Sequence, residues 1–174
     1  MGFLLKQIFE LFRLLNSDTG ANQIAGGIAC GLILGFAPAF SLQTVLVILC
    51  LFFFRIQIGA ALVSAFFFAF AAWLLDPVHH LVGEAILEAE ALRPLFTAMY
   101  NMPLVPLTRF YNTITMGAGV VSILLAPLVF VLCKKLIAKY RATVLARFHE
   151  TRLWKLWSAT PFYKWYTTYD QIYG

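Results

Sequence analysis

The sequence predicts an all-α, polytopic helical membrane protein with about four membrane helices, two of them forming a short helical hairpin, and amphipathic helices at both termini. Three observations predict this class. The 36 residues between Asp18 and Arg55 carry no charge, whereas one helical span needs only ~20 residues. Two further charge-free segments, residues 56–75 and 110–133, are each long enough to cross a bilayer. The whole chain is 61% hydrophobic and 12% charged, with a mean hydropathy of +0.82, whereas soluble domains are about 25% charged.

Residues 1–16 are predicted to form the amphipathic N-terminal helix. Lys6, Glu10 and Arg13 follow helical spacing on one side, and leucine and phenylalanine fill the other. Such a helix can lie flat in the headgroup region of a bilayer or pack on the bundle of its own chain, and the sequence leaves both alternatives open. The membrane domain that follows is predicted to comprise residues 17–133.

Residues 22–54 are predicted to form the helical hairpin. Gly35, Pro38 and Ser41 interrupt the uncharged run near its middle, which divides it into two short helices joined by a turn. Ser41 is placed to cap the second helix. We expect Gln43 to bond to carbonyl groups freed around Pro38, because an unpaired amide in hydrocarbon is costly. The sequence does not decide whether this hairpin spans the membrane or re-enters from one face.

A row of glycines follows one face of the first hairpin helix. Gly27, Gly31 and Gly35 recur at every fourth position, so they form a strip without side chains that lets another helix approach closely. The occupant of this strip stays open between a helix of the same chain and a partner chain or lipid tail. The residues predicted to bind a partner or lipid are Gly27, Gly31, Gly35, Pro38, Gln43 and Thr44.

Residues 76–109 are predicted to form a periplasmic loop with one amphipathic helix from about Pro77 to Leu92. The spacing allows a weak divalent-metal site on one face of that helix, but it equally describes the solvated side of an amphipathic helix. No second cluster of His or Cys completes a ligand set, so we predict no metal and no cofactor. The polar residues of that face are Asp76, His80, Glu84 and Glu88, with His79 adjacent.

Residues 134–174 are predicted to form a basic, aromatic tail at the cytoplasmic surface. Basic residues near span ends favour the cytoplasm, so we expect a multi-pass protein of the bacterial inner membrane with both termini cytoplasmic. Interleaved basic and aromatic residues can also bind nucleic acid. Beside a transmembrane span, anchoring to anionic lipid explains them better, and we predict no nucleic-acid partner. The interfacial anchors are Lys134, Lys135, Arg147, Arg152, Trp154, Trp157 and Trp165.

Residues 31–44, which read GLILGFAPAFSLQT, resemble the core of an uncharacterised family of small bacterial inner-membrane proteins. That family has a similar G-x-x-x-G-F-x-P core followed by L-Q-T, with a glycine where this chain has Ser41. Asp76-Pro77 with Gly83, and residues 110–113 with Gly117, resemble one subfamily more closely. The resemblance implies no known activity. It implies that the gene usually neighbours a larger uncharacterised membrane-anchored protein, which we expect to extend into the periplasm like the bridge-type lipid carriers.

The functional prediction starts from missing catalytic signatures. The sequence has no phosphate-binding glycine loop, no nucleophile elbow, no His-Glu-x-x-His motif and no carboxylate inside a predicted span. We therefore predict a non-enzymatic accessory subunit of the inner membrane. It would anchor or feed a larger envelope protein, and it would pass phospholipid through a groove beside the glycine row. Its expected partners are membrane lipids and that larger protein, and a homo-oligomer is also possible.

Two alternatives belong to other functional classes. The first is a small oligomeric channel or solute transporter, with Gln43, Thr44 and Asn112 as the polar lining. The second is a membrane-embedded metal-dependent enzyme that uses the loop face with Asp76, His79, His80 and Glu84.

Overall fold

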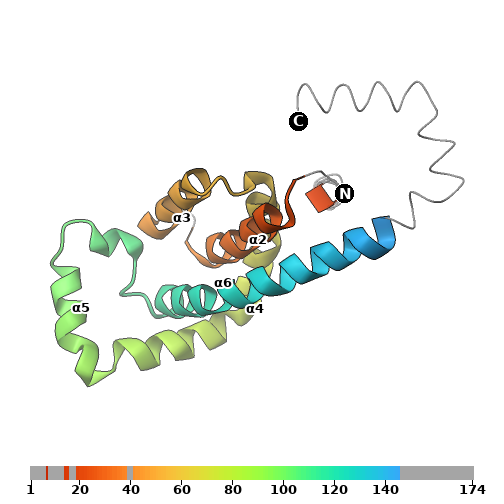
Figure 1. The fold of residues 1–174 in the computed structure, drawn as a ribbon. Coiled ribbons are helices and arrows are strands. Elements are labelled where there is room, and N and C mark those ends of the chain that lie inside the picture. The colour runs from red at the N-terminus through yellow and green to blue at the C-terminus, as the bar shows by residue number, and fades with distance from the viewer. Residues whose placement is uncertain (1–6, 8–13, 16–18, 39–40, 146–174) are drawn as a thin grey trace, which may run out of the picture. The chain divides into compact units, whose positions relative to one another are not determined.

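A computed structural model describes residues 7, 14–15, 19–38 and 41–145 of the chain (Figure 1). All regular structure within these residues is helical, with no strand, which confirms the predicted all-α class. The chain divides into two compact units, Met1–Lys135 and Leu136–Gly174. The predicted N-terminal helix 1–16 lies largely outside the described residues, and so does most of the tail.

The elements are α2 (Ala21–Phe36), α3 (Leu42–Phe53), α4 (Ile58–Leu87), η1 (Glu90–Leu92), α5 (Arg93–Tyr100), η2 (Val105–Thr108) and α6 (Thr113–Tyr140), followed by a π-helical turn at Arg141–Leu145.

Helices α2 and α3 are the two arms of the predicted hairpin. Ser41 caps α3 as predicted, because its Oγ accepts the backbone N–H of Thr44 at 3.3 Å. The two arms have 16 and 12 residues, which correspond to lengths of about 24 and 18 Å. Both are shorter than a bilayer core of about 30 Å.

Helix α4 is longer than the sequence predicts. The predicted span ended at residue 75, and a separate helix began near Pro77, but the chain forms one 30-residue helix that runs through Pro77. A proline removes one backbone donor and crowds one carbonyl, and neighbouring helices can compensate such a local defect at membrane depth. The charged residues after Leu75 therefore extend the same helix instead of starting a new element.

Helices α4 and α6 are both long and apolar enough to cross a membrane. Only 28% of the most apolar stretch of α4, and 22% of that of α6, is buried inside the structure. Large apolar side chains such as Trp73 of α4 and Leu124 of α6 are 77% and 72% exposed. A surface of this kind is unfavourable in water and suits helices that lie in a membrane.

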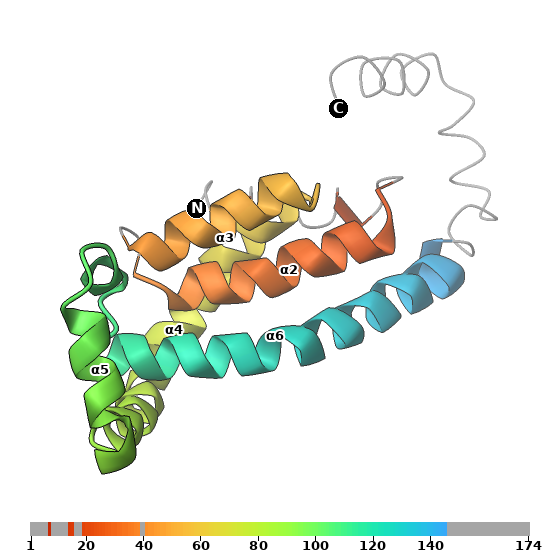
Figure 2. The same cartoon turned by 60° about the vertical axis from the view of Figure 1, so that its left-hand side comes forward.

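In the first unit, α2 lies between α3 and α6, and α4 passes behind it (Figure 2). Leu32 and Phe36 of α2 pack with Ala118 of α6 in the buried core. Phe68 and Ala71 of α4 pack against the same cluster. This core fixes the position of the hairpin relative to the two long helices.

Helices α4 and α6 touch backbone to backbone at two glycines. A Cβ atom added to Gly83 would collide with the carbonyl group of Thr113, and one added to Gly117 would collide with the carbonyl group of His79. Only glycine allows such an approach. Helix α5 then connects the far end of α4 to the region where α6 begins (Figure 1).

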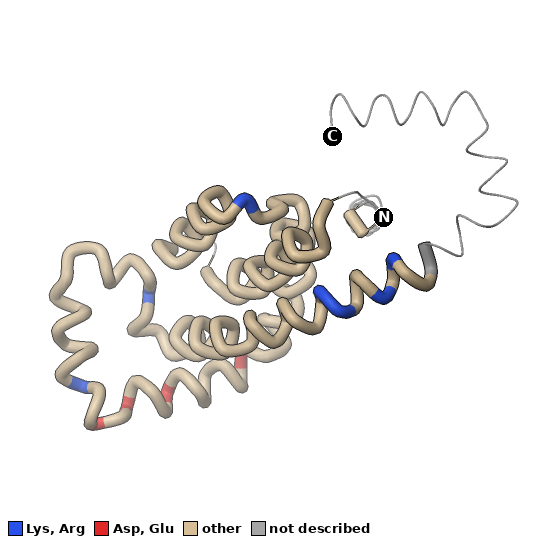
Figure 3. Tube along the Cα trace, viewed as in Figure 1, with Lys and Arg blue, Asp and Glu red and all other residues tan. Residues whose placement is uncertain are grey.

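Most of the described part of the first unit carries no charged side chain. Among the described residues, the acidic side chains lie on the second half of α4 and directly after it (Figure 3). The basic ones are divided between the end of α6 with the turn after it, Arg55 after α3, and Arg93 and Arg109 in the connection from α4 to α6. Helices α2 and α3 and residues 58–75 of α4 carry no charge. Many exposed apolar side chains lie in this uncharged zone, and others continue along the second half of α4 and residues 95–111.

Candidate functional site

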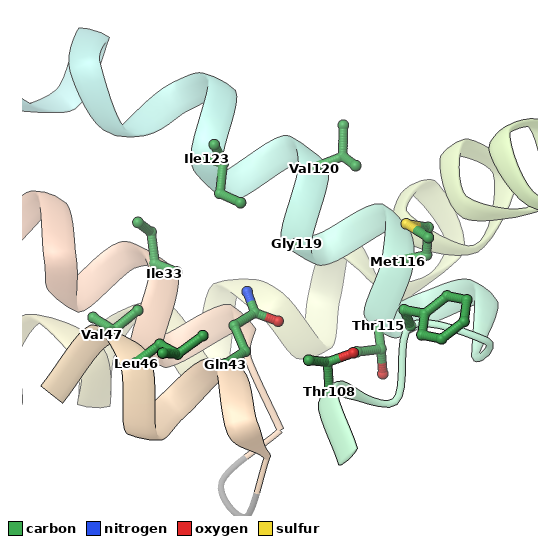
Figure 4. Close-up of a pocket in the computed structure, with 11 residues that line it drawn as sticks. Ile33, Gln43, Leu46, Val47, Thr108, Thr115, Met116, Gly119, Val120 and Ile123 are labelled. Atoms are coloured by element: carbon green, nitrogen blue, oxygen red, sulfur yellow. The ribbon is translucent and has the colours of Figure 1, made fainter. Parts of the chain in front are cut away.

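An apolar cavity of about 360 Å³ lies between the hairpin and the first turns of α6. We call it the Gln43 cavity, after its one amide side chain. The close-up shows side chains of α2 and α3 facing those of η2 and α6 across this space (Figure 4). The cavity is lined by Ile33, Gln43, Leu46, Val47, Thr108, Phe110, Thr115, Met116, Gly119, Val120 and Ile123.

The Gln43 side chain points from α3 toward α6 (Figure 4). Its Nε2 atom is buried and has no hydrogen-bond partner. Gly119 of α6 faces this amide, and a Cβ atom there would lie 3.6 Å from Nε2, an ordinary contact distance. A buried amide without a partner costs about 1–3 kcal/mol, so a ligand that brings a hydrogen-bond acceptor to this position would gain that amount.

The predicted bond from Gln43 to the carbonyls around Pro38 is wrong. Thr44 makes it instead, because its Oγ1 donates to the Pro38 carbonyl oxygen at 2.8 Å. Ser41 is the N-cap, so Thr44 is the third residue of the helix, whose side chain reaches back toward the cap. Gln43 precedes it by one residue, about 100° around the helix axis, and therefore faces α6.

The glycine row of α2 is covered by α4 of the same chain. A Cβ atom on Gly27 would lie 2.6 Å from the Gln57 carbonyl oxygen. On Gly35 it would lie 2.7 Å from the carbonyl oxygen of Ala65. Of the two occupants that the sequence left open, the intramolecular one fills the row, and no groove for lipid or a partner remains along these glycines.

The face predicted as an alternative metal site does not converge. His79 turns inward and is 1% exposed, with its ring centroid 4.9 Å from that of Phe36. His79 Nδ1 lies 4.0 Å from Asp76 Oδ1, while His80 pairs separately with Glu84 at 3.8 Å on the exposed side. Among the described residues, no group of three or more His, Cys, Asp or Glu side chains could hold a metal ion.

The polar lining of the alternative channel is likewise dispersed. Thr44 is occupied by the Pro38 carbonyl. The Asn112 Oδ1 atom accepts the backbone N–H of Thr115 at 3.0 Å and so holds the first turn of α6. Of the three predicted residues, only Gln43 faces a cavity.

The predicted interfacial anchors fall mostly beyond the described residues. Lys134 and Lys135 are exposed on α6. The remaining anchors, Arg147, Arg152, Trp154, Trp157 and Trp165, lie outside the described part of the chain.

Sequence reasoning missed the α6 side of the cavity. Thr115, Met116 and Gly119 line it, although they lie more than 70 residues from Gln43 in the chain. The available signal was the pair Gly117 and Gly119 at the start of a long apolar helix, since two glycines so close together favour a close approach on more than one face.

The fold and the cavity describe a small helical protein with two helices long and apolar enough to cross a membrane and an apolar pocket that is open to the surface. Over residues 6–144 the chain matches the family described as "Uncharacterized protein conserved in bacteria (DUF2062)", and it belongs to that family. This match confirms the resemblance carried by the glycine-rich core. A relative from Treponema pallidum (strain Nichols), described as "Uncharacterized protein", is 29% identical over 161 residues, which are 92% of this chain and 99% of the relative. No solved structure matches the chain.

Proposed function

We propose that this protein is a non-enzymatic, multi-pass subunit of the bacterial inner membrane that takes up a phospholipid and feeds it to a larger envelope protein. The observation that carries this proposal is the Gln43 cavity, which combines apolar walls with one buried, unpartnered amide. Hydrocarbon chains suit the walls. An ester carbonyl suits the amide, because it accepts a hydrogen bond and has no proton to give.

The placement in the membrane is supported by length and charge. Helices α4 and α6 can each cross a bilayer, and the uncharged residues 58–75 of α4 separate Arg55 from the acidic residues that follow (Figure 3). Arg93 and Arg109 lie on the acidic side of this zone. Lys134 and Lys135 at the end of α6 favour the cytoplasmic side. Both termini are then cytoplasmic, and α5 with its flanking turns faces the periplasm.

Under this proposal the ligand enters with its long axis along α6. The lining runs from Thr115 to Ile123, a rise of about 12 Å along the helix. The hydrocarbon of one leaflet is about 15 Å thick, half of the bilayer core. The cavity therefore has the depth of a single leaflet, counted from the predicted periplasmic end.

The larger partner is proposed on different grounds. The resemblance stated above implies a gene neighbour that is a larger membrane-anchored protein. The outward face of α3 supports a contact of this kind, because Leu49, Phe52 and Phe53 are more than half exposed, and the hairpin arm that carries them also contributes Gln43.

The proposal is tested by native mass spectrometry of the protein released from bacterial membranes in mild detergent. The wild type should retain phospholipid. Val120→Phe, which fills the Gln43 cavity, should lose most of it. Leu124→Phe is the matched control on the same helix, because Leu124 is 72% exposed and is not part of the lining, so it should retain lipid as the wild type does.

Two outcomes would contradict the proposal. One is a wild-type protein that carries no phospholipid and no partner when released from its native membrane. The other is equal retention by Val120→Phe and Leu124→Phe when both variants elute and melt as the wild type does. A partner that copurifies with the wild type and is identified as a larger envelope protein would support the second half of the proposal.

A further inference from the structure

A second cavity, of about 340 Å³, lies at the start of the segment that leads into α6. We call it the Arg93 cavity. It is formed by the end of α4, by α5 and by residues 110–111. Its lining is Leu87, Arg93, Phe96, Thr97, Tyr100, Asn101, Phe110 and Tyr111.

Arg93 is the one basic residue of this lining. In the described part of the chain its guanidinium forms no ion pair, and its side chain is exposed. The neighbouring polar side chains are tied to the α5 backbone: Thr97 Oγ1 donates to the Arg93 carbonyl oxygen, and Asn101 Nδ2 donates to that of Thr97, both at 2.9 Å. Arg93 is therefore the charged group of the lining with unused donors, and its planar fork suits the bidentate binding of a phosphate.

Aromatic rings form the rest of the wall. Phe96 and Phe110 lie with ring centroids 6.1 Å apart, and Tyr100 and Tyr111 lie 5.8 Å apart in an edge-to-face arrangement. Tyrosine next to arginine is typical of the headgroup level of a bilayer. The Arg93 cavity thus has the arginine and tyrosine residues that suit a lipid headgroup, whereas the Gln43 cavity has mostly the apolar residues that suit hydrocarbon.

Phe110 is the residue that the two cavities share. It is 8% exposed and belongs to the lining of both. A molecule that occupied both cavities would pass this ring, with its charged end beside Arg93 and its apolar end along α6. The lining of the Arg93 cavity ends at Tyr111, just before the residues that α6 contributes to the Gln43 cavity. A headgroup beside Arg93 and an acyl chain along α6 would follow the same order as in one leaflet.

We infer that the Arg93 cavity binds the phosphate group of the same phospholipid whose acyl chain occupies the Gln43 cavity, with Arg93 as the charged contact. The inference rests on the proposed function, since it assigns the headgroup of that ligand. The acidic residues nearest in sequence, Glu88 and Glu90, are not part of the lining, so they do not oppose an anion from inside the cavity.

The test compares two lipids with identical acyl chains in detergent solution: phosphatidylglycerol, which carries the phosphate, and diacylglycerol, which lacks it. Binding is measured by native mass spectrometry for the wild type, Arg93→Gln and Arg93→Lys. The wild type should prefer phosphatidylglycerol about tenfold or more, as expected for one charge-assisted contact. Arg93→Gln should lose this preference without weaker binding of diacylglycerol, and Arg93→Lys should keep part of it. Arg109→Gln is the control, because Arg109 lies in the same connection between α4 and α6 and lines neither cavity.

The outcomes separate the two proposals. If the wild type binds both lipids but Arg93→Gln keeps the full preference for phosphatidylglycerol, the inference is overturned and the proposed function stands. A wild type that binds neither lipid contradicts the proposed function itself. Glycerol phosphate that competes as strongly as the intact lipid would also overturn the inference, because the acyl chain would then add nothing.

Discussion

The replacement of Gly31 by alanine tests how α2 and α4 are held together. Gly31 is the middle member of the glycine row, and a Cβ atom there would lie 2.6 Å from the Ala61 carbonyl oxygen and 3.0 Å from the Ala65 nitrogen. It would also overlap the Ser64 hydroxyl, which donates to the Ala60 carbonyl oxygen at 2.6 Å inside α4. The added methyl group therefore meets backbone and a fixed hydroxyl rather than a flexible side chain.

The structure sets the size of the effect. Ordinary contacts of a Cβ atom begin near 3.4 Å, so α2 must retreat from the α4 backbone by at least about 0.8 Å, and further where the Ser64 hydroxyl stays in place. A gap of that size removes about a quarter to a half of the attraction at each contact along the pair. Overpacking of this kind costs about 1–3 kcal/mol, and the better helix propensity of alanine returns about 0.8–1 kcal/mol. We expect a net loss of up to about 2 kcal/mol in the free energy of unfolding.

Thermal unfolding in detergent, followed by tryptophan fluorescence, measures this loss as a lower Tm. For a chain of this size 1 kcal/mol corresponds to about 2–4 °C. Gly26→Ala is the matched control in the same helix, because a Cβ atom on Gly26 would lie 3.5 Å from the Ile56 side chain, an ordinary contact. Gly26→Ala should melt at or above the wild-type temperature. If Gly31→Ala melts no lower than Gly26→Ala, the close approach of α2 and α4 is refuted.

Three further predictions concern α3 and α6. Gly117→Ala should lower the Tm more than Gly119→Ala, because the first meets the His79 backbone and the second only the movable Gln43 amide; equal losses would argue against the crossing of α4 and α6. Ser41→Ala should cost about 1 kcal/mol, the worth of an N-cap, in the same melting experiment, and an unchanged Tm would mean that the cap does not form. Gln43→Leu should raise the Tm of lipid-free protein, since it removes an unpartnered buried amide, while it lowers phospholipid retention in native mass spectrometry; a lower Tm would show that the amide has a partner.

Local sequence signals predicted the hairpin well. Pro38 and Ser41 act within a few residues of their own position, so the turn and the cap of α3 could be inferred without knowledge of the rest of the fold. The glycine row was predicted as a contact face for the same reason, since its period is a property of one helix. Its occupant could not be predicted, because periodicity does not say which of several apolar helices will lie alongside.

Features that depend on distant residues escaped the sequence. The continuation of α4 through Pro77 depends on packing around the helix that outweighs the local preference of proline to end it. The Gln43 cavity depends on the different directions in which two neighbouring side chains point: Thr44 reaches the turn at Pro38, and Gln43 faces α6. His79 was predicted on the polar side of its helix, but Phe36 and Gly117 from two other helices enclose it.

Under the proposed membrane placement, the shortness of α3 has a consequence for the lipids beside it. With 12 residues it spans about 18 Å, yet its outer face carries large apolar side chains over most of that length. A lipid layer next to such a helix must become thinner locally, or the helix end must sink below the headgroups, because mismatch is relieved in one of these ways. Either adjustment disturbs the packing of the lipids beside α3, the helix that carries Gln43. It therefore lowers the free energy needed to extract one lipid from the leaflet.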